Sequence, residues 1–336
     1  MIILAGDIGG TKTELAIFDS AEPKMPKFEM RFVNKEQASF EAMLKHFLKL
    51  SNESVQYVCL AVAGTIVNGR CHMPNIAWVL DEQAIQKTLD VEHIKLINDL
   101  EATAHGMLTL SSDKIMVINA GIPNPTGNLA LIAAGTGLGE AILFRAGQDL
   151  DKQHYQIAAS EGGHVDYAPH NALEMALLQC IWSKFGHASW ERVVSGSGLA
   201  NIYEFLYEFM ALSENTAEPS QMNAQIMSAT DRGAAIFQAA QSEESPLSIQ
   251  AINIFIENYG AAAGNLALKA LSTGGLYIGG GIAPKLTDYF TNGTFMQEFT
   301  NKGRFSDMLK NVPVKLILEP KTALLGAAVF AIRHRF

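Results

Sequence analysis

The pattern that most constrains the fold occurs twice: an apolar run, a glycine-rich turn and a second apolar run. The first copy spans residues 2–19, with the turn Asp7-Ile8-Gly9-Gly10-Thr11. The second copy spans residues 129–145, with the turn Gly135-Thr136-Gly137-Leu138-Gly139. Each copy predicts a β-hairpin, because two short apolar segments flank a turn of small residues. The pair predicts an internal duplication in which each copy begins one half of an α/β protein, and both turns could hold one polyphosphate.

The first turn carries more chemistry than a tight hairpin needs. Gly9-Gly10 allows the backbone to approach a ligand closely and to direct N–H groups at it. Thr11 and Thr13 add hydroxyl groups, and Lys12 adds a positive charge. Asp7 repels a bare phosphate but can hold Mg²⁺ through water. The turn is neither a Walker A loop nor a dinucleotide fingerprint, because no G-x-x-x-x-G-K-[ST] occurs and a strand follows the glycines.

A second candidate site lies at Asn98-Asp99. The apolar run 94–97 predicts a buried strand, and the spacing of apolar residues after Asp99 predicts a helix. A carboxylate at the carboxyl end of a strand in an open α/β sheet lies where ligands bind. There Asp99 can accept a proton from a substrate hydroxyl group. The alternative is an ordinary helix N-cap, which also favours Asn and Asp.

Further polar residues follow glycines in the second half of the chain. Glu161-Gly162-Gly163-His164 allows a carboxylate and an imidazole to converge on one small ligand, although a solvated turn explains it too. Glu191 precedes another glycine turn. Gly279-Gly280-Gly281 would let a flat ring such as adenine lie against the backbone, and the alternative is a strand–helix turn. Asn75 is a candidate for a sugar pocket, with a surface loop as the alternative.

The composition excludes several classes of protein. The chain has 336 residues, of which 48% are hydrophobic and 18% charged, so we expect a globular protein with two domains. The net charge of −9 argues against a nucleic-acid-binding face. Three scattered cysteines without a C-x-x-C pair argue against disulfides and structural zinc. We expect a cytoplasmic protein, because no apolar run approaches transmembrane length and no signal peptide is recognisable.

The domain boundary is predicted from a loop rich in Gly, Pro and Asn at residues 119–128. We place the boundary just before it, so that residues 1–110 form a small α/β domain and residues 111–319 a large one. An alanine-rich helix at about residues 320–336 is expected to return to the first domain.

These motifs together resemble those of the bacterial glucokinases in the hexokinase/actin-like superfamily. The turn at residues 7–11 resembles the family's first phosphate motif, and the turn at residues 135–139 resembles its second. Asn98-Asp99 resembles the catalytic pair. The resemblance implies that Asp99 acts as the general base, while the two turns hold the phosphates of ATP.

The remaining motifs extend the resemblance over nearly the whole chain. Residues 161–166 and 191–196 resemble the sugar-binding segments, and residues 279–284 resemble the adenosine motif. The implied sugar-binding residues are Asn75, Asn98, Asp99, Glu161, His164 and Glu191. The implied nucleotide-binding residues are Asp7, Gly9, Gly10, Thr11, Gly135, Thr136, Gly137, Gly279, Gly280 and Gly281. Lys12, where family members often carry Asn, is added to them for its positive charge in the first turn.

The resemblance also implies a fold and a reaction. The fold is α/β, with two ribonuclease-H-like (actin/hexokinase-type) domains and a cleft between them, commonly in a homodimer. The branch is the one without the cysteine zinc motif, in agreement with the cysteine count. The expected reaction is phosphorylation of glucose at its 6-hydroxyl by ATP, with Mg²⁺ near Asp7. No nucleic acid or membrane is expected as a partner.

Three other functions are compatible with parts of this pattern. A kinase for another hexose or an amino sugar would share the hydroxyl contacts. A sugar-sensing regulator on the same fold needs a DNA-binding appendage, and we expect none before the strand that begins at Ile2. An actin-like structural ATPase would not need the glycine–histidine site at residues 161–164.

Overall fold

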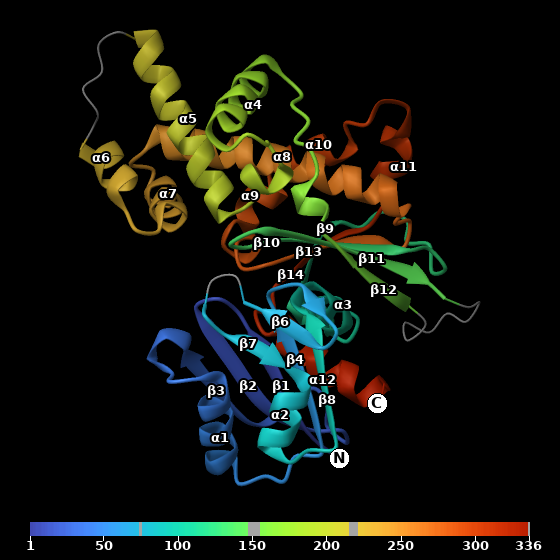
Figure 1. Ribbon diagram of the computed structural model, residues 1–336. Coiled ribbons are helices and arrows are strands. Elements are labelled where there is room, and N and C mark those ends of the chain that lie inside the picture. The colour runs from blue at the N-terminus through green and yellow to red at the C-terminus, as the bar shows by residue number, and fades with distance from the viewer. Residues whose placement is uncertain (74–75, 147–154, 215–220, 335–336) are drawn as a thin grey trace. The chain divides into compact units, whose positions relative to one another are not determined.

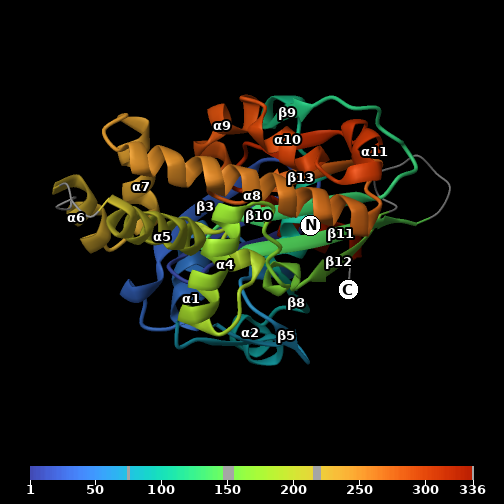
Figure 2. The same ribbon diagram turned by 90° about the horizontal axis from the view of Figure 1, so that it is seen from above.

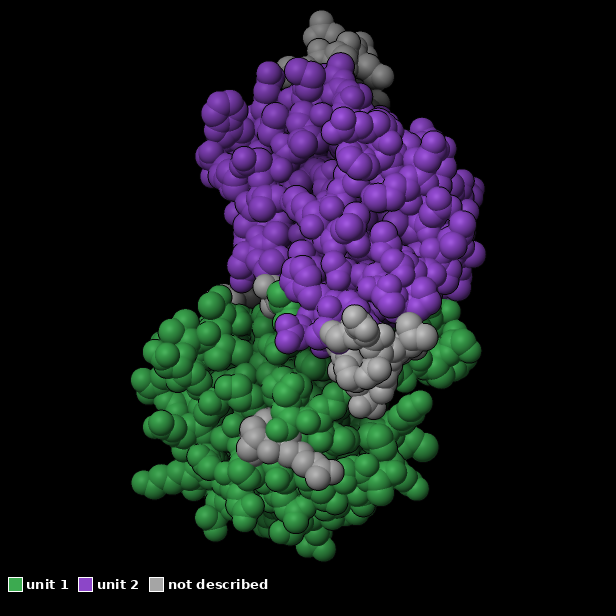
Figure 3. Space-filling view, turned by 90° about the vertical axis from the view of Figure 1, so that its right-hand side faces the viewer, with its two compact units in different colours: residues 1–115, 157–159, 319–336 green, residues 116–156, 160–318 purple. Residues whose placement is uncertain are grey.

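The computed structural model describes residues 1–73, 76–146, 155–214 and 221–334. The chain forms two compact units, which Figure 3 shows in different colours. Unit 1 comprises residues 1–115, 157–159 and 319–336, and unit 2 comprises residues 116–156 and 160–318. Each unit is described below by itself.

Unit 1 contains the elements from the N-terminus to the eighth strand and the last helix (Figure 1). Its strands are β1 (Ile2–Ile8), β2 (Lys12–Asp19), β3 (Pro26–Val33), β4 (Tyr57–Val62), β5 (Ile66–Val67), β6 (Arg70–His72), β7 (Val79–Asp81) and β8 (His93–Asn98). Its helices are α1 (Phe40–Ser51), α2 (Glu82–Leu89), α3 (Asp99–Met107) and α12 (Thr322–His334).

The main sheet of unit 1 has five strands in the order β3-β2-β1-β4-β8. β2 is antiparallel to both β1 and β3, whereas β1, β4 and β8 are parallel. Because Val62 pairs with Asn98, the carboxyl ends of β4 and β8 meet at one edge of the sheet. The turn between β1 and β2 lies at the same edge, since Ile8 also pairs with Val62. The sheet therefore gathers Asp7 and Asp99 at one end.

Residues of β1 alternate between the two faces of this sheet, as the period of two requires. Leu4 and Ile8 pack in the core that α1 and α2 cover. Ile3 and Ala5 face a second core, which contains residues of α3 and α12. Glycine allows these two helices to pack closely, because a Cβ on Gly326 would lie 1.7 Å from the carbonyl oxygen of Ala102. The C-terminal helix thus supports the helix that begins at Asp99.

Unit 2 contains most of the helices and the second sheet, except for Ile115 of β9 and residues 157–159 of β12 (Figures 1 and 2). The strands of this sheet are β9 (Ile115–Asn119), β10 (Leu129–Ala134), β11 (Leu138–Arg145), β12 (Tyr155–Ser160), β13 (Gly275–Gly279) and β14 (Val314–Ile317). The helices are α4 (Ala172–Phe185), α5 (Gly196–Glu214), α6 (Gln221–Ser228), α7 (Arg232–Gln241), α8 (Pro246–Ala270), α9 (Thr287–Thr291), α10 (Thr294–Thr300) and α11 (Ser306–Lys310).

The second sheet repeats the strand order of the first. Its order is β12-β11-β10-β13-β14-β9, in which β10 is antiparallel to β11 and parallel to β13, and β13 is parallel to β14. The hairpin β10–β11 therefore has the place that β1–β2 has in unit 1. The two sheets therefore agree with two similar α/β halves, each begun by one of the hairpins.

Helix α8 covers the sheet of unit 2, as Figure 2 shows from above. It is largely apolar and buried, and its Tyr259 is fully buried among Phe290 and Phe295. The hydroxyl oxygen of Tyr259 accepts a hydrogen bond of 3.1 Å from the backbone N–H of Ala134. This bond fixes the end of β10, directly before the second glycine turn.

The strands β5, β6 and β7 form a separate small three-stranded sheet in unit 1. These strands have only two or three residues each, which is too short for a period of two to be recognisable. Trp78 packs against Phe40 with ring centroids 5.6 Å apart, so it belongs to the core of unit 1. Asn75 lies outside the described residues. Within the part of the chain that the structure describes, no helix is long and apolar enough to cross a membrane.

Candidate active site

The first glycine turn presents backbone donors. The N–H of Gly9 donates to the carbonyl oxygen of Lys12 at 3.0 Å, which closes the turn. The N–H groups of Gly10 and Thr11 have no hydrogen-bond partner among the described residues. Thr11 and Lys12 are exposed, and the Lys12 ammonium group lies 3.6 Å from a carboxylate oxygen of Glu14. Two adjacent unpaired amides beside a cation form a suitable cradle for a phosphate group.

The expectation that Thr13 offers its hydroxyl to a ligand is wrong. Its side chain is buried, and the hydroxyl donates to Oδ1 of Asn34 at 2.8 Å. The reason is the alternation along β2: Lys12 points to solvent, so Thr13 points to the interior. Of the two threonines, only Thr11 presents its hydroxyl at the surface of this turn.

Asp7 lies in a strongly unfavourable environment for a carboxylate. Burial raises its pKa to about 7, and the negative charges of Asp99 and Glu14 act in the same direction. Two of the expected site residues, Asp7 and Asp99, are therefore electrostatic neighbours within unit 1. A cation would relieve this repulsion. In the described part of the chain no three side chains are grouped as a metal site, so a metal here would depend on water and phosphate oxygens for its other ligands.

Asn98 and Asp99 begin helix α3. Oδ1 of Asn98 accepts from the N–H of Leu100 at 2.9 Å and of Glu101 at 3.4 Å, so Asn98 is the N-cap. Asp99 Oδ1 also accepts from Leu100, and its carboxylate is half-buried at the positive end of the helix. The helix cap that the sequence offered as an alternative is therefore present, and it uses the side-chain oxygen of Asn98.

The second glycine turn has the same arrangement of amides. The carbonyl oxygens of Gly135 and Gly137 accept from the N–H groups of Gly196 (2.9 Å) and Gly135 (2.8 Å), respectively. The N–H groups of Thr136 and Gly137 have no partner among the described residues. In both turns the protein holds at least one carbonyl oxygen, and two adjacent N–H groups without a partner among the described residues can bind an anion.

Three of the predicted sugar-binding residues come together in unit 2. His164 Nε2 lies 3.9 Å from a carboxylate oxygen of Glu161, and His164 Nδ1 lies 3.9 Å from one of Glu191. The backbone joins their segments, because Asp166 forms a β-bridge with Ser189 and the N–H of Trp190 donates to Val165. Two carboxylates and an imidazole provide the acceptors and donors that sugar hydroxyl groups require.

Glu191 also contacts the second glycine turn. Its Oε2 accepts from the N–H of Leu138 at 3.0 Å. A Cβ on Gly137 would lie 2.4 Å from that same oxygen, which explains the glycine there. Glu191 therefore links the predicted sugar cluster to the predicted phosphate turn.

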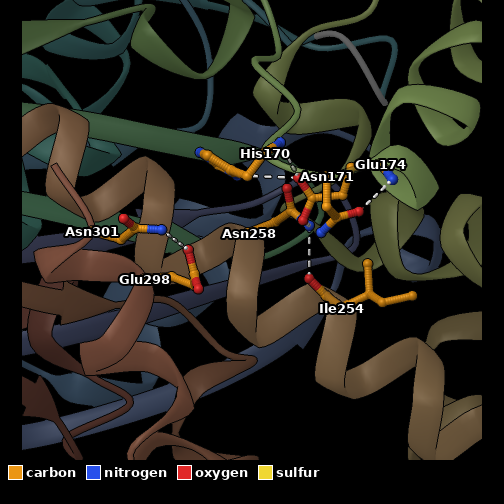
Figure 4. A network of polar contacts seen from close by, with 7 residues as sticks. All are labelled: His170, Asn171, Glu174, Ile254, Asn258, Glu298 and Asn301. Carbon is orange, nitrogen blue, oxygen red and sulfur yellow. Dashed lines mark hydrogen bonds and ion pairs between the residues drawn. The ribbon is translucent and has the colours of Figure 1, made fainter. Parts of the chain in front are cut away.

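A network of polar contacts surrounds Glu174 (Figure 4). Glu174, although buried, accepts from the backbone N–H of His170 at 2.6 Å and from the amide of Asn258 at 3.3 Å. Burial alone would raise the pKa of Glu174, but the hydrogen bonds of His170 and Asn258 outweigh it and lower the pKa. Nearby, Tyr167 packs edge-on against Trp190 at 5.1 Å. The network fixes the chain between the sugar cluster and α4.

A pocket of about 1010 Å³ in unit 2 joins the second turn to the third glycine motif. Its lining includes Gly135, Thr136, Gly196, Ser197, Asp231, Arg232, Gly233, Gly281, Ile282 and Lys285. Gly279 and Gly280 do not line it. Gly280 has a φ of +86°, and a Cβ there would lie 2.2 Å from the carbonyl oxygen of Ala134, so its role is close packing against β10.

Sequence reasoning missed the contribution of helix α7 to this pocket. Asp231 caps α7 by accepting from the N–H of Ala234 at 3.0 Å, and Arg232 is its first residue. Arg232 forms an ion pair of 3.3 Å with Glu204. An N-cap aspartate followed by Arg-Gly is a recognisable helix start, but nothing in the sequence relates it to a turn at residue 135.

Comparison with known proteins assigns the chain to a family. A model of the glucokinase family matches residues 4–334. The chain belongs to the glucokinase family. Glucokinase of Nostoc punctiforme is 39% identical over 99% of both chains, and glucokinase of Photorhabdus laumondii is 32% identical over 97% of this chain and 96% of that one. Members of the family are sugar kinases, and so is this protein.

Solved structures of similar proteins agree with this family assignment. A glucokinase from an Antarctic psychrotroph has a TM-score of 0.80, with 31% identity and 98% of each chain covered. A glucokinase from Balamuthia mandrillaris, solved in complex with glucose, has a TM-score of 0.79 at 21% identity, over 99% of this chain and 93% of that one. The second likeness concerns the fold alone. The predicted family and fold class are thereby confirmed.

Proposed function

We propose that this protein transfers the γ-phosphoryl group of ATP to the 6-hydroxyl group of glucose, with Asp99 as general base. The observation that carries the proposal is the pair of glycine turns, each with two unpaired amides, together with a carboxylate–imidazole cluster and a strand-end aspartate. Membership of the family supports this reading, since the curated relatives are named glucokinases. A hexose kinase must recognise both sugar hydroxyl groups and phosphate groups, whereas a protein that only binds sugar needs no phosphate site.

Phosphoryl transfer depends mainly on positioning and on charge stabilisation. In our proposal Gly10, Thr11, Thr136 and Gly137 donate N–H groups to phosphate oxygens. Lys12 adds a positive charge. The metal is Mg²⁺, held through water near Asp7, where it would relieve the repulsion between carboxylates.

The sugar is held by hydroxyl contacts in our proposal. Glu161 and Glu191 accept hydrogen bonds from sugar hydroxyl groups, and His164 donates or accepts one. The amide of Asn98 donates another, beside Asp99. Asp99 accepts the proton of the attacking hydroxyl group, so that the oxygen gains nucleophilicity as it approaches the γ-phosphorus.

Substrate profiling tests this function against its nearest alternative. Purified protein is incubated with ATP, Mg²⁺ and a series of hexoses and amino sugars, and phosphorylated sugar is quantified by ³¹P NMR. A kcat/KM for glucose well above that for mannose, fructose or glucosamine supports the proposal. A clear preference for another hexose or amino sugar would replace glucose as the substrate, and absence of ATP-dependent phosphorylation would refute a kinase.

We further propose a cytoplasmic homodimer, because the bacterial glucokinases that this chain resembles commonly form one. Analytical ultracentrifugation over a concentration series measures the mass directly. A mass of twice the 36.4 kDa chain supports the dimer, and a monomer at all concentrations refutes it.

A further inference from the structure

Asn34 lies outside every motif that the function uses, yet it contacts the first glycine turn at three points. It follows β3, more than twenty residues from the turn in sequence, and its exposed fraction is 2%. Its amide nitrogen donates to the carbonyl oxygen of Gly9 at 2.8 Å. Its backbone N–H donates to the carbonyl oxygen of Thr11 at 2.9 Å. Its Oδ1 accepts from the hydroxyl of Thr13 at 2.8 Å.

These three bonds decide which polar groups the turn presents. A turn binds an anion only if its N–H groups face the ligand and its carbonyl oxygens, which carry negative partial charge, face away. Asn34 holds the carbonyl oxygens of Gly9 and Thr11 on the buried side. The N–H groups of Gly10 and Thr11 then remain without a partner among the described residues.

We propose that Asn34 is a positioning residue that preorganises the first glycine turn for phosphate binding. The proposal rests on the function proposed above, since it assigns that turn to the phosphates of ATP. Asn34 does not touch the ligand. It acts by preventing the turn from rotating a carbonyl oxygen toward the phosphate, and by keeping the hydroxyl of Thr13 inside.

An asparagine suits this position better than its isosteres. The amide supplies both a donor for Gly9 and an acceptor for Thr13 on one rigid group. Asn34→Asp keeps the acceptor but loses the donor, and it places a negative charge beside a turn that must receive an anion. Asn34→Ala loses both side-chain bonds and retains only the backbone bond to Thr11. We therefore expect the wild type to bind nucleotide most tightly, Asn34→Ala more weakly and Asn34→Asp most weakly.

The test separates nucleotide binding from sugar binding. Binding of a non-hydrolysable ATP analogue with Mg²⁺, and separately of glucose, is measured by calorimetry on folded protein. We expect Asn34→Ala to weaken the ATP analogue about tenfold, as the loss of one to two hydrogen bonds implies, and to change glucose affinity less than about twofold. In turnover assays the KM for ATP should rise by a similar factor.

Thr13→Val and Asn128→Ala serve as matched variants. Thr13→Val keeps the shape of the buried side chain, removes one of the same bonds and should weaken the analogue about threefold. It should have no further effect in the Asn34→Ala background. The Asn128 side chain also makes two bonds to backbone groups, those of Ala270 and Arg145, and it precedes β10 in unit 2, whereas the second turn follows β10. Asn128→Ala should leave nucleotide affinity unchanged.

The outcomes distinguish the two proposals. Unchanged nucleotide affinity in Asn34→Ala and Thr13→Val overturns the role of Asn34, and so does an equal loss of glucose and nucleotide affinity. If Asn34→Ala does not fold, Thr13→Val alone decides. A wild-type protein that binds nucleotide but phosphorylates no hexose refutes the proposed reaction and leaves the role of Asn34 open to the same binding test. A wild-type protein that binds no nucleotide overturns both the proposed reaction and the proposed role of Asn34.

Discussion

The raised pKa of Asp7 predicts how the free energy of unfolding changes with pH. Its pKa is about 7 in the folded protein, against an ordinary value of 3.8 in the unfolded chain. Between these values the folded state binds more protons than the unfolded state, so the free energy of unfolding falls as pH rises through this window. The contribution of Asp7 to the free energy of unfolding is therefore largest below pH 3.8 and smallest above about pH 7.

The magnitude follows from these two pKa values. Linkage gives a loss of about 2 kcal/mol in the free energy of unfolding between about pH 5.5 and about pH 8 from this one carboxylate. Asn at position 7 stays neutral and avoids this loss. Asp7→Asn should thus gain about 2 kcal/mol more over the wild type at about pH 8 than at about pH 5.5, while losing most kinase activity.

Urea unfolding at the two pH values, in EDTA and without nucleotide, measures this difference. Asp288→Asn, which alters an exposed carboxylate, is the control and should follow the wild type at both pH values. An Asp7→Asn variant whose stability difference from the wild type is the same at both pH values would refute the reasoning. It would mean that Asp7 is already ionised in the folded protein at pH 5.5.

Two further predictions concern the ligand sites. Gly135 lines the pocket at the second turn, and a Cβ there would meet no protein atom within 4 Å, so Gly135→Val should weaken nucleotide binding alone. A Cβ at Gly137 would clash with the carboxylate of Glu191, so Gly137→Val should weaken the binding of both nucleotide and glucose. Calorimetry with both ligands tests this, and an equal effect of both variants on glucose would contradict it. Glu161→Gln should raise the KM for glucose, leave that for ATP nearly unchanged, and narrow the preference for glucose over the deoxyglucose that lacks the hydroxyl group held by Glu161. Steady-state kinetics with a set of deoxyglucoses decides; an unchanged KM and preference would remove Glu161 from the site.

The fold was predictable because its signals are local. Each hairpin has two apolar runs around glycines, so the repeat at residues 7–11 and 135–139 can be recognised without a structure. The strand-end position of Asp99 was predictable for the same reason, since an apolar run ends there and a helical pattern begins. The strands β5, β6 and β7 were not predictable, because two or three residues carry no period.

The missed parts of the site depend on tertiary contacts. Asn34 contacts Gly9 and Thr13 from the residue that follows β3, and its own neighbours in sequence form no motif. The inward direction of the Thr13 hydroxyl follows from the exact start of β2, which a sequence pattern does not fix. Likewise the close packing of Gly280 against Ala134 of β10 can be recognised only in the folded sheet.

The central claim is that Asp99 takes the proton from the attacking sugar hydroxyl group. Asp99→Asn keeps the size of the side chain and removes its capacity to accept that proton. Single-turnover transfer from ATP to glucose, followed by rapid quench, measures the chemical step directly, and calorimetry measures glucose affinity in the same variant. Our account predicts nearly wild-type glucose affinity and a rate of transfer lower by about 10²–10⁴-fold. A variant that binds glucose and transfers the phosphoryl group at nearly the wild-type rate would contradict it.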